Sequence, residues 1–246
     1  MPLREEWERS GNWLFRWRSY LPMLMAGPVI WSQLRHTPPE HSGLTEPWVA
    51  GCFGVALLGL LIRAVVIGYA PAGTSGRNTH DGQVALRLNT TGFYSVARHP
   101  LYLGNLFMWM GVALLARSWW VAVLMVLVFW LYYERIMFAE EEYLRRTFGD
   151  LFVKWAQRTP AFLPDFSRWC APALPFSFRN VLRREYSGLL AIVVSFAILN
   201  TLANSRSEGS ITVDDVDLAM LGATTALYLL LRTLKHRTRM LHVEGR

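Results

Sequence analysis

Long apolar stretches alternate with polar segments along most of the chain. The clearest stretch, 48–70, has 23 residues and a single charge, Arg63. At ~1.5 Å per residue, a helix of this length crosses the ~30 Å hydrocarbon core of a membrane. The stretch 20–34 is shorter and contains Pro22 and Pro28, which interrupt a regular helix. The pattern predicts an all-α, polytopic transmembrane helix bundle of about six spans, over 20–34, 48–70, 101–116, 118–138, 188–203 and 218–231.

The segments between these spans differ in character. Residues 1–18 mix charges with tryptophan and are expected to lie at the membrane surface. The polar, Gly-rich loop 71–95 is expected to end in an extended strip that packs on a functional site. After the fourth span, 139–159 has the pattern of an amphipathic cytoplasmic helix, bent at Gly149.

Two charged positions have simple structural interpretations. Arg63 lies seven residues from the end of its apolar stretch, so its head is expected to reach the membrane interface. Glu142 is followed by Arg145 and Arg146, and this spacing favours a solvated helix face with pairing between residues three and four apart.

The chain has 246 residues, of which 52% are hydrophobic, and a formal net charge of +7. In a soluble protein this charge would favour nucleic-acid binding, but in a membrane protein Lys and Arg gather on cytoplasmic loops. The loop 71–100 and the tail 232–246 are basic, whereas the loop 204–217 is acidic. Six spans place both basic regions on one side. We therefore expect no nucleic-acid partner, and a bacterial inner-membrane protein with both termini in the cytoplasm.

The first polar motif opens the third apolar stretch. Residues 94–104 read Tyr-Ser-Val-Ala-Arg-His-Pro-Leu-Tyr-Leu-Gly. Pro100 suits the first turn of a helix, where no backbone donor is needed. The unpaired N–H groups and partial positive charge of a helix N-terminus can hold an anionic ligand group. The motif therefore predicts a ligand site at the start of this helix.

A second polar motif follows the fourth apolar stretch. It begins at Glu140 and Glu141 and continues through Leu144 to Phe148 and Gly149. Because the third and fourth spans have almost no residues between them, they are expected to be antiparallel neighbours. Their two polar ends then return to the same side of the membrane.

Together the two motifs resemble those of the isoprenylcysteine carboxyl methyltransferase and phospholipid methyltransferase superfamily of integral membrane enzymes. The Arg-His-Pro-x-Tyr-x-Gly motif is matched from Arg98 to Gly104, and the Glu-Glu-x-x-Leu-x-x-x-Phe-Gly motif from Glu140 to Gly149. The resemblance covers 86–164. It divides the chain into an N-terminal membrane segment with two spans (1–85), a methyltransferase core (86–164) and a basic loop with two C-terminal spans (165–246).

The resemblance implies a cytoplasmic pocket for S-adenosylmethionine and a lipid or lipid-anchored acceptor. Methyl transfer is an in-line displacement, so no protein nucleophile is expected, only positioning and exclusion of water. Arg135 and Arg158 are the candidates for binding an anionic acceptor. The residues that the resemblance places around the cofactor are Leu86, Arg87, Leu88, Asn89, Tyr94, Arg98, His99, Pro100, Leu101, Tyr102, Gly104, Glu140 and Glu141.

The sequence departs from the family pattern at three positions. The family Arg four residues before the first Glu is Ile136 here, and Arg135 is displaced from it by ~100° around a helix. Two family tyrosines are replaced by Phe152 and Trp155, which lack the hydroxyl groups. These changes favour a lipid headgroup or lipid phosphate over a prenylated cysteine as the acceptor.

Two other functions stay open. A membrane sterol-type reductase would use NADPH, and Arg77 and Arg87 could contact its extra phosphate. A non-catalytic membrane scaffold would use His99 and Glu140 only for stability. No metal site is expected, because His36 and His41 lie in a Pro-rich loop without a Cys or carboxylate companion. The last two spans could line a lipid entrance or form the contact of a homo-oligomer.

Overall fold

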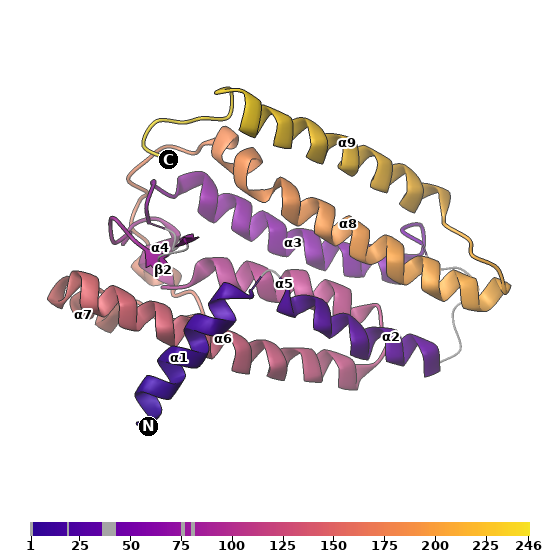
Figure 1. Ribbon diagram of the computed structural model, residues 1–246, viewed down its shortest axis with the longest axis horizontal. Helices are drawn as coiled ribbons and strands as arrows, with labels where there is room; N and C mark the ends of the chain where they lie inside the picture. The colour runs from indigo at the N-terminus through magenta and orange to yellow at the C-terminus, as the bar shows by residue number, and fades with distance from the viewer. Residues whose placement is uncertain (1, 19, 36–42, 75–76, 80–81) are drawn as a thin grey trace.

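Helices make up most of the computed structural model, which describes residues 2–18, 20–35, 43–74, 77–79 and 82–246 (Figure 1). His36, His41 and the rest of that loop therefore lie outside the described residues. The all-α class is confirmed, with one short antiparallel hairpin of β1 (Arg77–Thr79) and β2 (Gly82–Val84). The helices are α1 (Leu3–Arg16), α2 (Ala26–Arg35), α3 (Pro47–Tyr69), α4 (Phe93–Val96), α5 (Pro100–Leu114), α6 (Trp119–Phe148), α7 (Asp150–Arg158), α8 (Phe178–Glu208) and α9 (Asp215–Arg237), with 3₁₀ turns η1 (Leu21–Met25) and η2 (Phe166–Arg168).

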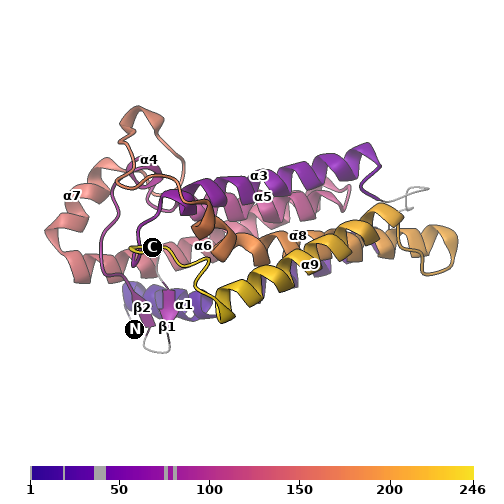
Figure 2. The ribbon, with the colours of Figure 1, turned by 90° about the horizontal axis from the view of Figure 1, so that it is seen from above.

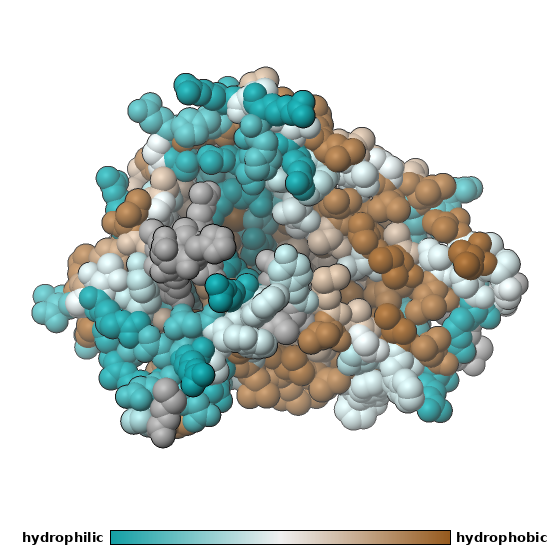
Figure 3. Space-filling view, in the orientation of Figure 1, coloured by the Kyte–Doolittle hydropathy of each residue, from teal (hydrophilic) through white to brown (hydrophobic). Residues whose placement is uncertain are grey.

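The long helices run side by side along the long axis of the molecule, as the two perpendicular views agree (Figures 1 and 2). Helix α3 packs against α5 and α8, α5 packs against α6, and α8 packs against α9. Both chain termini lie at the end of the bundle that carries α4, α7 and the hairpin (Figure 1). That end is also hydrophilic, whereas hydrophobic side chains cover much of the rest of the face seen in Figure 3.

Among the described residues, four helices are long and apolar enough to cross a membrane, namely α3, α6, α8 and α9. The protein is therefore an integral membrane protein. Helix α5 is apolar but has only 15 residues. The short first span expected over 20–34 is not one of these four helices. The prolines there accompany a 3₁₀ turn, and the following α2 has ten residues, which extend only ~15 Å.

The expected boundary between the fourth span and an amphipathic helix is also wrong. Helix α6 continues through it without a break for 30 residues, until Phe148. The chain then turns at Gly149, whose φ of 52° lies in the region that favours glycine, and α7 begins at the next residue. Glu140 and Glu141 are therefore held on a continuous helix, which fixes their direction.

Small residues bring α3 and α5 into close contact. A Cβ on Gly104 would lie 2.5 Å from Cγ of Arg63 and 2.7 Å from the carbonyl oxygen of Gly59. Two helical turns further along α5, a Cβ on Gly111 would lie 2.6 Å from the carbonyl oxygen of Cys52. Small residues at such a contact let two membrane helices pack backbone to backbone. Gly104 of the first motif is thus a packing residue in this fold.

Helix α1 lies across the polar end of α6. Arg4 forms an ion pair of 2.5 Å with Glu142, whose side chain is 8% exposed. The expectation that Glu142 lies on a solvated face is therefore wrong, because α1 covers that face. Gly11 marks the closest approach, since a Cβ there would lie 2.1 Å from the carbonyl oxygen of Arg135.

Candidate active site

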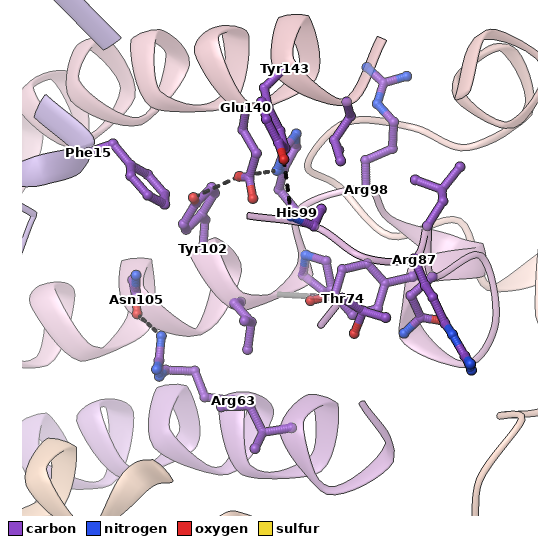
Figure 4. A pocket seen from close by; sticks show the side chains of 18 of the residues that line it. Phe15, Arg63, Thr74, Arg87, Arg98, His99, Tyr102, Asn105, Glu140 and Tyr143 are labelled. Carbon is purple, nitrogen blue, oxygen red and sulfur yellow. Dashed lines mark hydrogen bonds and ion pairs between the residues drawn. The ribbon is translucent and has the colours of Figure 1, made fainter. Parts of the chain in front are cut away.

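A cavity of about 240 Å³ opens at the polar end of the bundle, where the first turn of α5 faces the last turns of α6 (Figure 4). Other parts of its wall come from α1, α3, α4, α7, α8 and the strip after β2. Its lining residues are Phe15, Arg18, Arg63, Ile67, Thr74, Ala85, Arg87, Leu88, Asn89, Tyr94, Arg98, His99, Pro100, Leu101, Tyr102, Asn105, Glu140, Tyr143, Leu144, Trp155, Arg184 and Glu185.

His99 lies between two carboxylates at the start of α5. It is the residue that precedes Pro100, the first residue of the helix, and it is 6% exposed. Its Nε2 is 3.0 Å from Oε1 of Glu141, and its Nδ1 is 3.4 Å from Oε2 of Glu140. The antiparallel packing of α5 and α6 brings these groups together, because each lies at the polar end of its helix.

The two carboxylates determine the charge of this imidazole. Burial disfavours the charged ring and by itself lowers the pKa of His99. Hydrogen bonds and charge from Glu140 and then Glu141 outweigh burial and raise the pKa of His99 to about 9. His99 is therefore a cation at neutral pH, and it offsets part of the negative charge of the carboxylate pair.

Tyr102 completes the cluster from one turn further along α5. Its hydroxyl donates a hydrogen bond of 2.9 Å to Oε2 of Glu140. Its ring stacks on that of His99, with centroids 5.5 Å apart and planes 10° apart. Figure 4 shows Glu140 held between Tyr102 and His99 on the cavity wall. The carboxylate is thereby fixed in one orientation beside the cavity.

Arg98 stabilises this cluster through hydrogen bonds to Glu141 and to the end of α7. Its Nε donates to Oε1 of Glu141 at 2.8 Å, and its Nη1 donates to the carbonyl oxygens of Ala156 and Thr159 at 2.7 and 3.0 Å. The backbone N–H of Arg98 also donates to the carbonyl oxygen of Pro160. Arg98 and Glu141 therefore tie the start of α5 to the end of α7 and hold His99 in place.

The strip after β2 forms the outer wall, as expected. The N–H of Ala85 donates to the hydroxyl of Tyr143 at 3.2 Å. Trp155 replaces a family tyrosine but still donates from Nε1 to the carbonyl oxygen of Tyr94, at 3.1 Å. Burial, together with the charge of Glu140, raises the pKa of the Tyr94 phenol. Tyr94 is therefore neutral and presents a partly buried aromatic ring.

The opposite wall carries a polar network that sequence reasoning missed. Arg63 of α3 donates from Nε and Nη2 to the two carboxylate oxygens of Glu185 on α8, both at 2.7 Å. Its Nη1 donates to Asn105 of α5 at 2.6 Å, and Asn105 donates to Tyr133 at 2.8 Å. Arg63 thus does not reach for the interface, contrary to expectation. A charge within an apolar span is costly unless it has a buried partner. The place of Arg63 inside such a span is therefore the sequence signal that a partner exists.

The structure separates the predicted cofactor residues into two groups. Two of these residues lie outside the lining of the cavity: Leu86 is 75% exposed, and Gly104 packs on α3. Glu141 also lies outside the lining, where it pairs with His99 and Arg98. The predicted residues that do line the cavity are Arg87, Leu88, Asn89, Tyr94, Arg98, His99, Pro100, Leu101, Tyr102 and Glu140.

The two predicted acceptor residues lie away from this cavity. The guanidinium of Arg135 lies 4.0 Å from the ring centroid of Trp7, in the contact between α6 and α1. Arg158 is exposed on α7. The arginines that do line the cavity near the membrane helices are Arg18, Arg63 and Arg184.

The chemistry of the cavity suits a ligand with an amino group, a carboxylate group and an additional cation. A fixed carboxylate, a helix N-terminus and partly buried aromatic rings can bind amino, carboxylate and sulfonium groups, respectively. S-adenosylmethionine has all three. Among the described residues, no group of three His, Cys, Asp or Glu side chains is placed to hold a metal ion.

Comparison with known proteins places this chain in a family. The phospholipid methyltransferase family matches residues 49–151, which include both sequence motifs. The chain is 30% identical over 168 residues to the cobalt-zinc-cadmium resistance protein CzcN of Cupriavidus metallidurans, over 65% of this chain and 74% of that protein. It is 34% identical over 128 residues to the nickel-cobalt-cadmium resistance protein NccN of Alcaligenes xylosoxydans xylosoxydans, over 52% of this chain and 57% of that protein.

A third relative carries an enzyme name. The chain is 33% identical over 130 residues to the protein-S-isoprenylcysteine O-methyltransferase B of Arabidopsis thaliana, over 50% of this chain and 63% of that protein. No solved structure matches the chain significantly. The chain belongs to the superfamily of membrane methyltransferases that includes the phospholipid and isoprenylcysteine enzymes, as the two motifs predicted.

Proposed function

We propose that this protein is an S-adenosylmethionine-dependent methyltransferase that acts on a lipid or lipid-anchored acceptor. The observation that carries the proposal is the cluster of His99, Glu140 and Tyr102 on the wall of a cavity at the N-terminus of α5. Membership of a methyltransferase superfamily supports the same reaction. We further propose that the protein lies in a bacterial inner membrane. The cavity then opens to the cytoplasm, since the basic tail lies at the same end of the helix bundle as the cavity.

Each wall of the cavity has a separate task in this proposal. Bound S-adenosylmethionine would supply a methyl group on a cationic sulfur. Glu140, oriented by Tyr102 and His99, accepts hydrogen bonds from the amino or ribose groups of the ligand. The aromatic ring of Tyr94 faces the cationic part, an attraction of ~0.5–2 kcal/mol. The remaining walls exclude water and hold the reacting groups in line.

The acceptor is proposed to be a lipid headgroup or lipid phosphate rather than a prenylated cysteine. Ile136 replaces the arginine expected in isoprenylcysteine enzymes, and it is fully buried in the core. Its neighbour Arg135 packs on Trp7 instead of lining the cavity. One relative is named as an isoprenylcysteine O-methyltransferase, so transfer to protein is retained as an outcome of the test.

The test is methyl transfer in membranes that contain the protein. Methyl-labelled S-adenosylmethionine is added, and organic-soluble lipid is then separated from protein. We expect label in the lipid fraction, and loss of that label with Glu140→Gln. Asp150→Asn is the matched control, because Asp150 is exposed on α7 and does not line the cavity. Label in protein would instead favour the prenylated cysteine. Label in neither fraction would count against the proposal.

Equilibrium binding separates the methyltransferase from a reductase. The purified protein is expected to bind S-adenosylhomocysteine and to show no saturable binding of NADPH. Glu140→Gln should weaken the first interaction. The opposite preference would favour a sterol-type reductase, and binding of neither ligand would favour a scaffold.

A further inference from the structure

A basic cavity lies apart from the proposed cofactor cavity, at the end of the bundle where α8 begins and α9 ends. We call it the tail pocket. Its volume is about 420 Å³, and among the described residues it shares no lining residue with the cofactor cavity. The residues that line it are Arg183, Lys235, Thr238, Arg239, Leu241 and His242.

The lining of the tail pocket is rich in cationic groups. Arg183 comes from α8, Lys235 from the last turn of α9, and Arg239 from the segment after α9. Among the described residues that line the pocket, none is Asp or Glu. Guanidinium and ammonium groups bind phosphate through charge-assisted hydrogen bonds. The pocket therefore suits an anionic group and repels a cationic one.

The segment after α9 has a defined fold rather than that of a loose tail. The N–H of His242 donates to the carbonyl oxygen of Arg239 at 2.9 Å, which closes a turn. Leu241 within this turn is only 6% exposed and anchors it to the bundle. Further along, the carbonyl oxygen of Gly245 accepts a hydrogen bond of 2.8 Å from the N–H of Ala72. The backbone that carries Arg239 and His242 is thus held on both sides.

Two tyrosines indicate the depth of the tail pocket in the membrane. The rings of Tyr186 on α8 and Tyr228 on α9 have centroids 5.2 Å apart. The Nζ of Lys235 lies 5.2 Å from the centroid of the Tyr186 ring. Tyrosine is enriched at the membrane–water interface, where its ring meets the lipid headgroups. The pocket beside these rings therefore lies at headgroup level.

An apolar surface continues from the tyrosines into the membrane-spanning part of α9. Leu227, Leu229 and Leu230 are 39%, 56% and 56% exposed. Figure 3 shows hydrophilic side chains gathered at the end of the bundle where α9 finishes, and hydrophobic ones further along. In a bilayer, lipid chains cover such a surface. A lipid with its headgroup in the tail pocket can therefore keep its chains in the hydrocarbon.

Helix stability explains only part of this charge. Cations in the last turn of a helix interact favourably with the negative end of its dipole, which accounts for Lys235 and Arg237. Arg183 lies near the start of α8, where the dipole gives a cation no such stabilisation, and Arg239 lies beyond the end of α9. The convergence of these two arginines on one cavity is the feature that indicates a ligand.

We propose that the tail pocket binds the phosphate group of an anionic phospholipid from the adjacent leaflet. The phosphate lies beside Arg183 and Arg239, and the acyl chains lie along α9. Basic pockets between membrane helices are suited to anionic headgroups in this way. The lipid is a bound partner and not the methyl acceptor, because the tail pocket shares no described lining residue with the cofactor cavity. The proposal does not depend on the proposed methyltransferase function.

A bound phosphate also changes the stability of this end of the protein. Cations that line one cavity repel each other, and a phosphate between them replaces repulsion with attraction. Helix α9 packs mainly on α8, so the lipid adds a second connection between these helices. A ligand that binds only the folded state raises its stability. Anionic lipid is therefore expected to raise the midpoint of thermal unfolding.

The test uses the 246-residue protein in nanodiscs of phosphatidylcholine. Trace amounts of phosphatidylglycerol or phosphatidylcholine with the same photoreactive acyl chain are added, and cross-linked peptides are mapped. We expect phosphatidylglycerol to label residues 215–237 at least about fivefold more than phosphatidylcholine. Equal labelling by the two lipids would overturn the proposal. Full displacement by millimolar inorganic phosphate would also overturn it, since the ligand would then be free phosphate.

Variants distinguish a pocket from a diffuse basic surface. Arg183→Gln and Arg239→Gln should each reduce the preference for phosphatidylglycerol about fivefold and remove most of its effect on thermal unfolding. Arg237→Gln is the matched control, because Arg237 is exposed on α9, carries the same charge and does not line the pocket. Equal losses in all three variants, or no loss in the first two, would overturn the proposal.

Conservative variants guard against a loss that comes only from misfolding. Arg183→Lys and Arg239→Lys keep the positive charge, so we expect them to keep most of the preference for phosphatidylglycerol. Thermal unfolding shows whether each variant is folded. A folded lysine variant that loses the preference as completely as the glutamine variant would overturn the role of charge in the pocket.

Discussion

Tyr102 donates a hydrogen bond of 2.9 Å to Oε2 of Glu140, and this bond joins the first turns of α5 to the polar end of α6. It connects the two sequence motifs directly. Because Glu140 also faces His99, its carboxylate is oriented before any ligand binds. A preoriented carboxylate loses little further freedom when it accepts hydrogen bonds from a ligand.

Glu140→Gln is expected to weaken binding of S-adenosylhomocysteine about tenfold to a hundredfold, since hydrogen bonds to a charged group contribute ~1.5–3 kcal/mol. Tyr102→Phe should have a smaller effect in the same direction, because it removes only the orienting bond. Isothermal titration calorimetry of the purified variants measures both. Unchanged affinity in Glu140→Gln would show that this carboxylate does not contact the ligand.

The charge of His99 predicts a pH dependence with a definite sign. The folded-state pKa is raised from 6.5 to about 9. The stabilisation from the charged ring is therefore fully present below pH 6.5 and is lost as the pH rises through about 9. Thermal unfolding should show the midpoint falling across that range, and His99→Gln should remove most of this dependence. A fall confined to more acidic pH would contradict the assignment.

Close packing of α3 on α5 makes Gly104 intolerant of a side chain. Gly104→Ala should destabilise the protein by about 1–3 kcal/mol, because the new Cβ overlaps Arg63 and the backbone of Gly59. Gly54→Ala is the matched control, as a Cβ there would meet no described neighbouring atom within 4 Å. Differential scanning fluorimetry compares the two. Similar stability of both variants would mean that the two helices are less closely packed than described.

The buried pair of Arg63 and Glu185 should be costly to break on one side. Glu185→Met leaves a guanidinium without its carboxylate in the bundle, and a loss of about 3–5 kcal/mol is expected. Replacing both residues with methionine should restore much of the stability, since neither charge is then left unpaired. Unfolding of the two single variants and the double variant forms a cycle that measures the interaction. Additive effects would show that the two residues do not interact.

The cluster around His99 could be predicted because its parts are close in sequence or joined by a short hairpin. Arg98, His99 and Tyr102 lie within five residues, and Glu140 and Glu141 lie at the far end of two consecutive spans. Antiparallel packing of consecutive helices then brings the two groups together. The helix direction that orients Glu140 could also be expected once the hairpin was recognised.

Contacts between distant helices could not be read from local patterns. Arg63 and Glu185 are 122 residues apart, and each alone resembles an interfacial charge. The pattern of α6 predicts a solvated Glu142, because it does not reveal that α1 covers this residue. Arg135 has the right charge for an anionic acceptor, but its rotation around α6 turns it to Trp7. Rotation and pairing of helices depend on packing across the whole bundle.

The wide sequence separation of Arg63 and Glu185 also bears on how the protein is made. Helix α3 leaves the ribosome and reaches the bilayer well before α8 has been synthesised. During that interval its guanidinium has no carboxylate partner, a burden of up to ~2.5–3.5 kcal/mol for insertion at the centre of a membrane helix. A nascent chain that stops before residue 178 carries both methyltransferase motifs yet retains this unpaired charge. We expect such a fragment to be less stable in the membrane than a chain that includes α8, so a helix that is translated late helps to retain an early one.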